Sequence, residues 1–260
     1  RGSLQRFHWF EIVTVLNSFS DLIIPVSNNT RQQLINHGID PRKTVTVHNA
    51  IDLTVFDKAK ASHEFLDACQ YFKETKDVSP LVICGGNLIT RKGHEYFLLA
   101  AKEILKSKSA HFLIIGDGKQ REHLEKFADY LKVKKCVAFT GRISWSEMYC
   151  VFANEADICV SPSLGELFPY YVLECMAAGK PVVATDVGGV SEAVMAGVNG
   201  FLVPPKNPFS ISEAVLKLLD NQEEAKAMGH KSRAIVETKF NLSLMVDSLT
   251  TCYEQSLARK

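Results

Sequence analysis

Short apolar runs alternate with longer amphipathic stretches along most of this sequence, and this alternation constrains the fold more than any other feature. Runs such as "PLVIC", "HFLIIG" and "KPVVAT" are apolar at successive positions, as expected for strands that are covered on both faces. Strands that alternate with helices at this spacing are joined by right-handed crossovers into a mainly parallel sheet. The sequence therefore predicts an α/β fold, with helices on both faces of a doubly wound parallel sheet.

The apolar runs and the amphipathic stretches give a full set of expected elements. Strands are expected at residues 22–26, 44–48, 81–84, 112–115, 137–139, 158–160, 182–184 and 201–203. Helices are expected at residues 4–18, 29–37, 63–74, 93–106, 119–131, 144–153, 170–178, 189–195, 208–219, 223–239 and 242–258.

The polar stretch 57–79 is expected to be a linker between two parts of the chain. Residues 80–240 are enough for a complete doubly wound domain, and residues 241–260 form a closing helix. Residues 1–56 contain only two expected strands and two expected helices, so we interpret them as the C-terminal part of a preceding domain. The chain opens Arg-Gly-Ser with no Met, and Arg1 is therefore not expected to be the native start.

Charge and cysteine usage exclude several classes of protein. The net charge is +1, with both signs well mixed, which gives no electrostatic case for a nucleic-acid partner or an anionic membrane surface. No apolar run approaches the ~18 residues of a membrane span, and no signal peptide is visible. The seven cysteines include no Cys-x-x-Cys pair, which predicts buried, reduced thiols in a cytoplasmic protein.

Glycines and polar residues follow the expected strands. In an open parallel sheet, ligands bind in the crevice beyond the carboxyl ends of the strands, and glycine lets the backbone approach a ligand closely. The first exit is "GGNLITRKG" (85–93), and the exits after strands 158–160 and 182–184 are "SPSLGE" and "TDVGG". The candidate binding residues at the exits of the other central strands and in the first loop are Gly86, Asn87, Arg91, Lys92, Gly116 and Arg142.

The segment "SPSLGELFPYYVLECMAAGKPVVATDVGG" (161–189) predicts an anion site at a helix N-terminus. Proline is tolerated at the first position of a helix, so we expect a helix to begin at about Pro169. The N–H groups of Tyr170, Tyr171 and Val172 would then point out of its N-terminus, where the helix dipole favours negative charge.

Two carboxylates and one lysine extend this anion site. Glu174, one turn inside the expected helix, can accept hydrogen bonds from a pair of vicinal hydroxyls, and Glu166 on the preceding loop can hold another hydroxylated group. Lys92, at a neighbouring strand exit, supplies the charge that a departing diphosphate needs. An anion with hydroxylated groups on either side describes a nucleoside diphosphate joined to a sugar.

The block "GELFPYYVLECMAAGKPVVATDVGGVSEAV" resembles the Glu-x7-Glu signature of retaining GT-B glycosyltransferases (group 1, family 4 type). "VSNNTRQQLINHGIDPRKTVTVHNAIDLTVF" (26–56) resembles the end of that family's N-terminal domain, and "GNLITRKGHEYFLLAA" resembles its diphosphate loop. The resemblance implies a Rossmann-like donor-binding domain at 80–240, a remnant of the Rossmann-like acceptor domain at 1–56, and a final helix packing toward that remnant. It also implies that Glu174 binds the ribose, Glu166 the donor sugar and Lys92 the diphosphate.

One position departs from the family pattern. The family usually has Arg five residues before the lysine, where this chain has Asn87, so the diphosphate charge falls to Lys92 alone or to Lys92 and Arg91 together. The resemblance implies transfer from a UDP- or GDP-linked sugar with retention of configuration, no cofactor, and no metal because an Asp-x-Asp motif is absent. The acceptor (a sugar, a lipid-linked group or a protein) is left open, as is peripheral membrane association through the rest of the N-terminal domain.

Other interpretations stay open for these residues. Glu174 can be a first-turn carboxylate that favours the helix dipole, Glu166 a solvated loop residue and Lys92 an exposed helix-start lysine. Arg91 and Arg142 can be surface charges, while the rings of Tyr170 and Tyr171 are expected to pack or to cover the pocket. His48 and His94 are expected to have structural roles.

Other functions also stay open. A glycosidase is disfavoured, because it needs both carboxyl groups at one anomeric carbon. The remaining alternatives are an inactive sugar-nucleotide-binding module that needs a partner domain, and an epimerase or a phosphorylase on the same fold.

Overall fold

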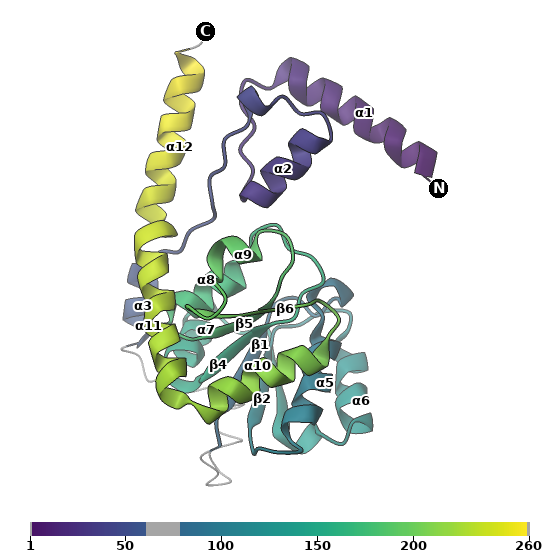
Figure 1. Ribbon diagram of the computed structural model, residues 1–260, viewed down its shortest axis with the longest axis vertical. Coiled ribbons are helices and arrows are strands. Elements are labelled where there is room, and N and C mark those ends of the chain that lie inside the picture. The colour runs from purple at the N-terminus through teal and green to yellow at the C-terminus, as the bar shows by residue number, and fades with distance from the viewer. Residues whose placement is uncertain (1, 61–78, 259–260) are drawn as a thin grey trace.

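The computed structural model describes residues 2–60 and 79–258, and its centre is a six-stranded parallel sheet of order β3-β2-β1-β4-β5-β6 (Figure 1). The chain winds outward in one direction from β1 to β3 and in the other from β4 to β6, so the switch point lies between β1 and β4. The predicted α/β class and parallel sheet are confirmed. The strands are β1 (Leu81–Gly85), β2 (His111–Ile115), β3 (Val137–Gly141), β4 (Ile158–Ser161), β5 (Val182–Thr185) and β6 (Gly200–Val203).

Helices cover both faces of the sheet and continue beyond it. Several begin at predictable signals: Ser144 and Glu147 form a capping box at the start of α7, and Asn207, Asn221 and Asn241 cap α10, α11 and α12 with their side chains. The helices after the first strand are α5 (His94–Ile104), α6 (Arg121–Tyr130), α7 (Trp145–Cys150), α8 (Tyr170–Ala177), α9 (Val190–Ala193), α10 (Pro208–Asp220), α11 (Gln222–Lys239) and α12 (Leu242–Leu257). The short helices are η1 (Pro41–Lys43), η2 (Thr90–Lys92), η3 (Lys134–Cys136) and the π-helical η4 (Val151–Glu155).

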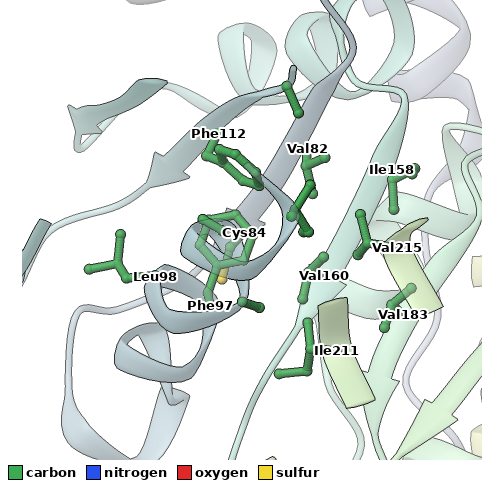
Figure 2. Close-up of a cluster of buried hydrophobic side chains, with 14 of the residues drawn as sticks. Val82, Cys84, Phe97, Leu98, Phe112, Ile158, Val160, Val183, Ile211 and Val215 are labelled. Carbon is green, nitrogen blue, oxygen red and sulfur yellow. The ribbon is translucent and has the colours of Figure 1, made fainter. Parts of the chain in front are cut away.

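The sheet has a buried apolar cluster on each face, which explains why its strands are apolar at successive positions. Val82 and Cys84 of β1 belong to one cluster and Ile83 to the other, because neighbouring strand residues point to opposite faces. In the first cluster, α5 and α10 pack onto the sheet through Phe97 and Val215, among others (Figure 2). The second cluster lies beneath α7, α8 and α11.

The six cysteines within the described residues carry free thiols, and all but Cys136 are buried. Burial raises the pKa of the Cys84 thiol, a shift to which the neighbouring Cys159 also contributes. Five of these six thiols are therefore buried, as expected, whereas Cys136 is only half-buried. Cys69 lies outside the described residues.

The N-terminal part differs from the prediction in its strands. It contains α1 (Gly2–Phe19) and α2 (Asn28–Asn36), as expected, but residues 22–26 and 44–48 form only one isolated parallel bridge, between Ile23 and Thr44. The Val47 N–H still donates to the Pro25 carbonyl at 3.1 Å, but proline has no N–H with which to continue a ladder. The two expected strands were therefore wrong.

One helix was missed by the sequence prediction. Helix α3 (Leu53–Lys60) crosses the expected boundary between residues 56 and 57. Phe56 is 2 % exposed, and its ring centroid lies 4.0 Å from that of Tyr149 on α7. Ile51 also forms a bridge with Asn241, immediately before α12. The chain thus joins the sheet-bearing part from Ile51 onward, and the expected helix 63–74 lies outside the described residues.

Helix α12 continues beyond the sheet toward the same side as α1 and α2 (Figure 1). Both α1 and α12 carry exposed apolar side chains, at Ile12, Val15 and Phe19 on α1 and at Leu244, Val246, Tyr253 and Leu257 on α12. Within residues 2–60 and 79–258, no helix has both the length and the apolar character to cross a membrane.

Candidate functional site

The loops that leave β1, β2 and β3 are held close together at the carboxyl edge of the sheet. The Gly86 N–H donates to the Ile115 carbonyl at 2.9 Å, and the Gly116 N–H donates to the Gly141 carbonyl at 3.0 Å. Gly116 has a φ of +128°, and a Cβ placed there would lie 2.2 Å from the Gly86 carbonyl oxygen. Glycine at this position therefore lets two strand exits touch.

Lys92 and Glu166 form an ion pair across the switch point, with Nζ and Oε1 2.5 Å apart. Lys92 ends the short helix η2 after β1, and Glu166 lies on the loop after β4. Their side chains are 18 % and 7 % exposed, respectively, so this is a sheltered pair. The structure thus brings together Lys92 and Glu166, which were predicted to bind the diphosphate and the donor sugar, respectively.

Two neighbours fix the orientation of the Glu166 carboxylate. The Ser163 hydroxyl donates to Oε1 at 2.7 Å, and the Arg91 Nη1 atom lies 3.5 Å from Oε2. Arg91 also donates to the Gly165 carbonyl at 2.6 Å, and Thr185 at the end of β5 donates to the Ser163 carbonyl at 2.5 Å. Arg91 is therefore joined to this loop, although its own side chain is 54 % exposed.

The loop after β5 supports the Glu166 loop from the other side. Gly188 has a φ of +57°, and a Cβ there would lie 1.6 Å from the Glu166 carbonyl oxygen. The Gly189 N–H donates to the Leu167 carbonyl at 3.1 Å. The two loops are thus in backbone contact beside Glu166.

Helix α8 has no side-chain cap at its N-terminus, where Pro169 is the N-cap residue. Pro169 is therefore the residue before the helix, whereas the sequence predicted it as the first residue of the helix. The first bond of the helix runs from the Leu173 N–H to the Pro169 carbonyl at 3.4 Å. The N–H groups of the preceding residues, Tyr170 to Val172, lie outside that ladder, next to the positive end of the helix dipole.

Glu174 is buried one turn inside α8, with a residue exposure of 5 %. Burial raises the pKa of Glu174 to about 7, although the nearby charge of Lys92 acts in the opposite direction. Burial also raises the pKa of Tyr149 to about 12, and the charge of Glu174 contributes to this shift. Lys92 therefore bonds one predicted carboxylate and acts electrostatically on the other.

Tyr170 and Tyr171 have different environments. Tyr170 is 49 % exposed, whereas the Tyr171 ring is buried beneath β1, and its hydroxyl donates to the Ile83 carbonyl at 3.0 Å. A Cβ on Gly85 would lie 2.6 Å from this ring. Tyr171 thus packs against the end of β1, from which the loop that carries Lys92 leaves the sheet.

Asn87 and Arg142 are exposed. Among the described residues, neither side chain makes a hydrogen bond or an ion pair with Lys92, Glu166 or Glu174. Ser163, Thr185 and Gly188 all contact the Glu166 loop but were not predicted as individual site residues. The signal that could have found them is their position, because each lies in a strand exit beside the predicted glutamate.

His94 begins α5 and is 2 % exposed, and neither of its ring nitrogens has a hydrogen-bond partner. Burial, followed by the charge of Lys92, lowers the pKa of His94 to about 4. The ring is therefore neutral near pH 7. In the part of the chain that the structure describes, no three His, Cys, Asp or Glu side chains are grouped to hold a metal ion.

Comparison with known proteins places this geometry in a family. Residues 70–235 match the family model described as glycosyl transferases group 1. Alpha-D-kanosaminyltransferase of Streptomyces kanamyceticus is 32% identical over 180 residues, which cover 69% of this chain and 46% of that protein. A GDP-mannose-dependent monoacylated alpha-(1-6)-phosphatidylinositol monomannoside mannosyltransferase of Corynebacterium glutamicum is 30% identical over 186 residues, covering 67% of this chain and 47% of that protein.

The solved structures show the same fold. The crystal structure of Anabaena HepE in complex with UDP superposes with a TM-score of 0.85 at 21% sequence identity, covering 96% of this chain and 68% of that one. The GT-B fold class expected from the sequence is thus confirmed. This chain spans about half the length of the two curated relatives. On the match to more than half of its residues, the chain belongs to the group 1 glycosyltransferase family.

Proposed function

We propose that this chain binds a nucleoside-diphosphate sugar, linked to UDP or GDP, and forms the donor half of a glycosyltransferase that retains the anomeric configuration. The observation that carries the proposal is the position of Lys92. Its ammonium is 2.5 Å from Glu166 and acts on the buried Glu174, and both carboxylates belong to the segment that contains the uncapped start of α8.

The diphosphate is the part of the donor that this edge of the sheet suits best. The N–H groups at the start of α8 and the Lys92 ammonium offer hydrogen bonds and positive charge to phosphate oxygens. As the bond from the sugar to the diphosphate breaks, negative charge grows on the leaving oxygen, and these same groups stabilise it. Asn87 brings no charge, so most of the neutralisation would fall to Lys92, with a smaller part from Arg91.

The two carboxylates would hold the hydroxylated groups on either side of the diphosphate. Glu174 in its charged form accepts two hydrogen bonds from the ribose, and Glu166 accepts one from the donor sugar. A bound phosphate would compete with Glu166 for the Lys92 ammonium. As the ammonium moves toward the phosphate, a Glu166 carboxylate oxygen becomes free to accept a hydrogen bond from a sugar hydroxyl.

The known relatives support either base. HepE was crystallised with UDP, and the Corynebacterium enzyme is named for its dependence on GDP-mannose. We place the protein in the cytoplasm, in keeping with the free buried thiols. The proposal includes peripheral membrane contact through the acceptor domain. It does not specify the acceptor.

Calorimetry with UDP, GDP and ADP, and with their glucose and mannose conjugates, tests the proposal directly. We expect a UDP or GDP compound to bind the chain and Lys92→Ala to weaken that binding, while Lys226→Ala, on the exposed surface of α11, leaves it unchanged. No binding of any of these compounds would contradict the proposal.

Product analysis by NMR separates the alternatives. A transferase releases nucleoside diphosphate with the sugar in the original anomeric configuration on an acceptor or on water. A C2-epimerised sugar would indicate an epimerase, and a sugar 1-phosphate would indicate a phosphorylase. Donor binding without turnover for any acceptor would support the inactive module.

A further inference from the structure

Glu192 in helix α9 receives three hydrogen bonds from the N-terminal part of the chain. Its Oε1 atom accepts from the Asn29 backbone N–H at 2.8 Å, and its Oε2 atom accepts from the Asn28 backbone N–H at 2.9 Å. The His48 Nε2 atom lies 2.7 Å from the same Oε2 atom. We call Glu192, Asn28, Asn29 and His48 the Glu192 junction. It joins helix α9 to the N-terminal part of the chain, which contributes no strand to the sheet.

The junction places a carboxylate at the N-terminus of α2, where free N–H groups and the helix dipole favour negative charge. Ser27, the N-cap residue, satisfies the Thr30 N–H with its own hydroxyl, so Glu192 serves the two N–H groups that Ser27 leaves. The side chain of Glu192 is 19 % exposed. Its burial favours the neutral form, but the bonds from His48, Asn29 and Asn28 outweigh burial and lower the pKa of Glu192.

A second set of contacts holds the N-terminal part against the loop that ends at α8. The Asn49 side-chain amide donates to the Phe168 carbonyl at 2.9 Å. The His48 ring centroid lies 4.8 Å from that of Phe168 and 5.5 Å from that of Phe240 at the end of α11. His48 therefore contacts both the Glu192 carboxylate and Phe168, which lies in the loop before α8.

A short path of close backbone contacts leads from the junction to Glu166. Gly189, three residues before Glu192, approaches Ser27 so closely that a Cβ would lie 2.6 Å from the Ser27 Cβ atom. Its neighbour Gly188 touches the Glu166 carbonyl. A shift of α2 or α9 would therefore move the Glu166 loop through these direct contacts of Gly188 and Gly189.

We propose that Glu192 is a positioning residue whose three hydrogen bonds hold α2 and His48 against loop 163–169 and thereby fix the place of Glu166. The mechanical part of this proposal, that Glu192 holds loop 163–169 in place, is argued from these contacts alone. The consequence for the donor sugar rests on the proposed function, in which Glu166 binds that sugar while Glu174 binds the ribose.

Two variants break the junction from opposite sides. Glu192→Gln keeps the shape of the side chain but sets an NH₂ donor where a carboxylate oxygen accepted. Asn28→Pro removes one N–H donor and leaves Glu192 unchanged, at the first position of α2, where proline is tolerated. Asn28→Ala is the matched control, because it removes an exposed side chain and keeps the N–H. Glu223→Gln, at a glutamate whose side chain is 89% exposed, controls for the lost charge.

Hydrogen–deuterium exchange without nucleotide tests the mechanical part. We expect peptides covering residues 29–36 and 163–169 to exchange about fivefold to tenfold faster in Glu192→Gln and in Asn28→Pro, with β2 unchanged as a measure of intact folding. The two controls should match the parent protein. Faster exchange in 29–36 alone, or in neither peptide, would overturn the proposal. If Glu192→Gln fails to fold, Asn28→Pro and Asn28→Ala still decide it.

Calorimetry tests the consequence for the site. We expect Glu192→Gln to weaken binding of the UDP-sugar or GDP-sugar several-fold relative to the bare nucleotide, because only the sugar reaches Glu166. Equal losses for both ligands would contradict a role through Glu166. If the parent protein binds no nucleotide at all, the proposed function fails, while the exchange result still decides whether the junction holds the loop.

Discussion

The Lys92 ammonium bonds the Glu166 carboxylate at 2.5 Å across the switch point of the sheet. Ser163 and Arg91 hold the same carboxylate from other directions. The cation is thus already aimed at the place where we propose the diphosphate binds. A donor that binds there replaces one anionic partner of Lys92 by another, so the ammonium keeps a negatively charged partner.

Lys92→Ala should weaken binding of the preferred nucleoside diphosphate about tenfold or more, the range for loss of a charge-assisted hydrogen bond. Arg91→Ala should weaken it less than about threefold, since its side chain is 54 % exposed and exposed charges contribute little. Calorimetry on both variants makes the comparison. Equal effects would show that Arg91 carries the charge missing at Asn87.

Glu174→Ala should reduce affinity for the bare nucleotide, and Glu166→Ala should reduce affinity only when the sugar is attached. The reason is that the ribose is common to both ligands, whereas the sugar is not. Titration of each variant with the nucleotide and with its sugar conjugate gives the four affinities. A bare nucleotide insensitive to Glu174→Ala would remove the ribose assignment.

The contribution of Glu174 to stability should fall as the pH rises from about 4.5 to about 7, whereas that of the buried His94, whose pKa is lowered, changes in the opposite direction. Its pKa in the folded state is about 7, above the ordinary value of 4.5, so the native state keeps a proton that the unfolded state loses, and each rise in pH favours unfolding. Glu174→Gln removes this titration. The variant should match the parent below pH 4.5 and exceed it by up to about 3 kcal/mol at pH 8.

Urea unfolding at a series of pH values measures this difference, with Glu223→Gln as the control at an exposed glutamate. A constant gap between Glu174→Gln and the parent from pH 4.5 to pH 8 would show that the Glu174 carboxyl titrates at its ordinary value in the folded protein.

Gly188→Ala should destabilise the protein more than Gly197→Ala. Both glycines have a left-handed backbone, with φ of +57° and +75°, but a Cβ meets the Glu166 carbonyl at 1.6 Å in the first case and nothing within 4 Å in the second. Gly197→Ala should therefore cost only the roughly 1–2 kcal/mol of the strained conformation. Thermal unfolding of the two variants isolates the cost of the close contact, and similar melting temperatures would contradict it.

The sheet could be predicted because each of its strands is apolar at successive positions and both faces are buried. Residues 22–26 and 44–48 have similar apolar character but form a single bridge, since strand pairing depends on neighbours that lie far away in sequence. Helix α3 was missed because "LTVFDKAK" is short and adjoins a polar stretch; its position depends on the contact between Phe56 and Tyr149.

The same distinction holds at the site. Glu166, Glu174 and Lys92 could be selected because carboxylates and a lysine stand out in apolar or glycine-rich strand exits. The Glu192 junction could not, because two of its three hydrogen-bond partners are backbone N–H groups 163 and 164 residues away. Backbone donors leave no mark in the amino-acid sequence, so only the folded chain reveals them.

The packing of α3 has a practical consequence for anyone who wishes to shorten this protein. A truncation that began at residue 57, where the sequence suggests a natural cut, would remove the Phe56 ring from its place against Tyr149 and leave a hole. Loss of a buried phenylalanine side chain typically costs about 3–5 kcal/mol, a large share of the stability of a domain. A minimal fragment for crystallisation or ligand screening should therefore start upstream of Ile51.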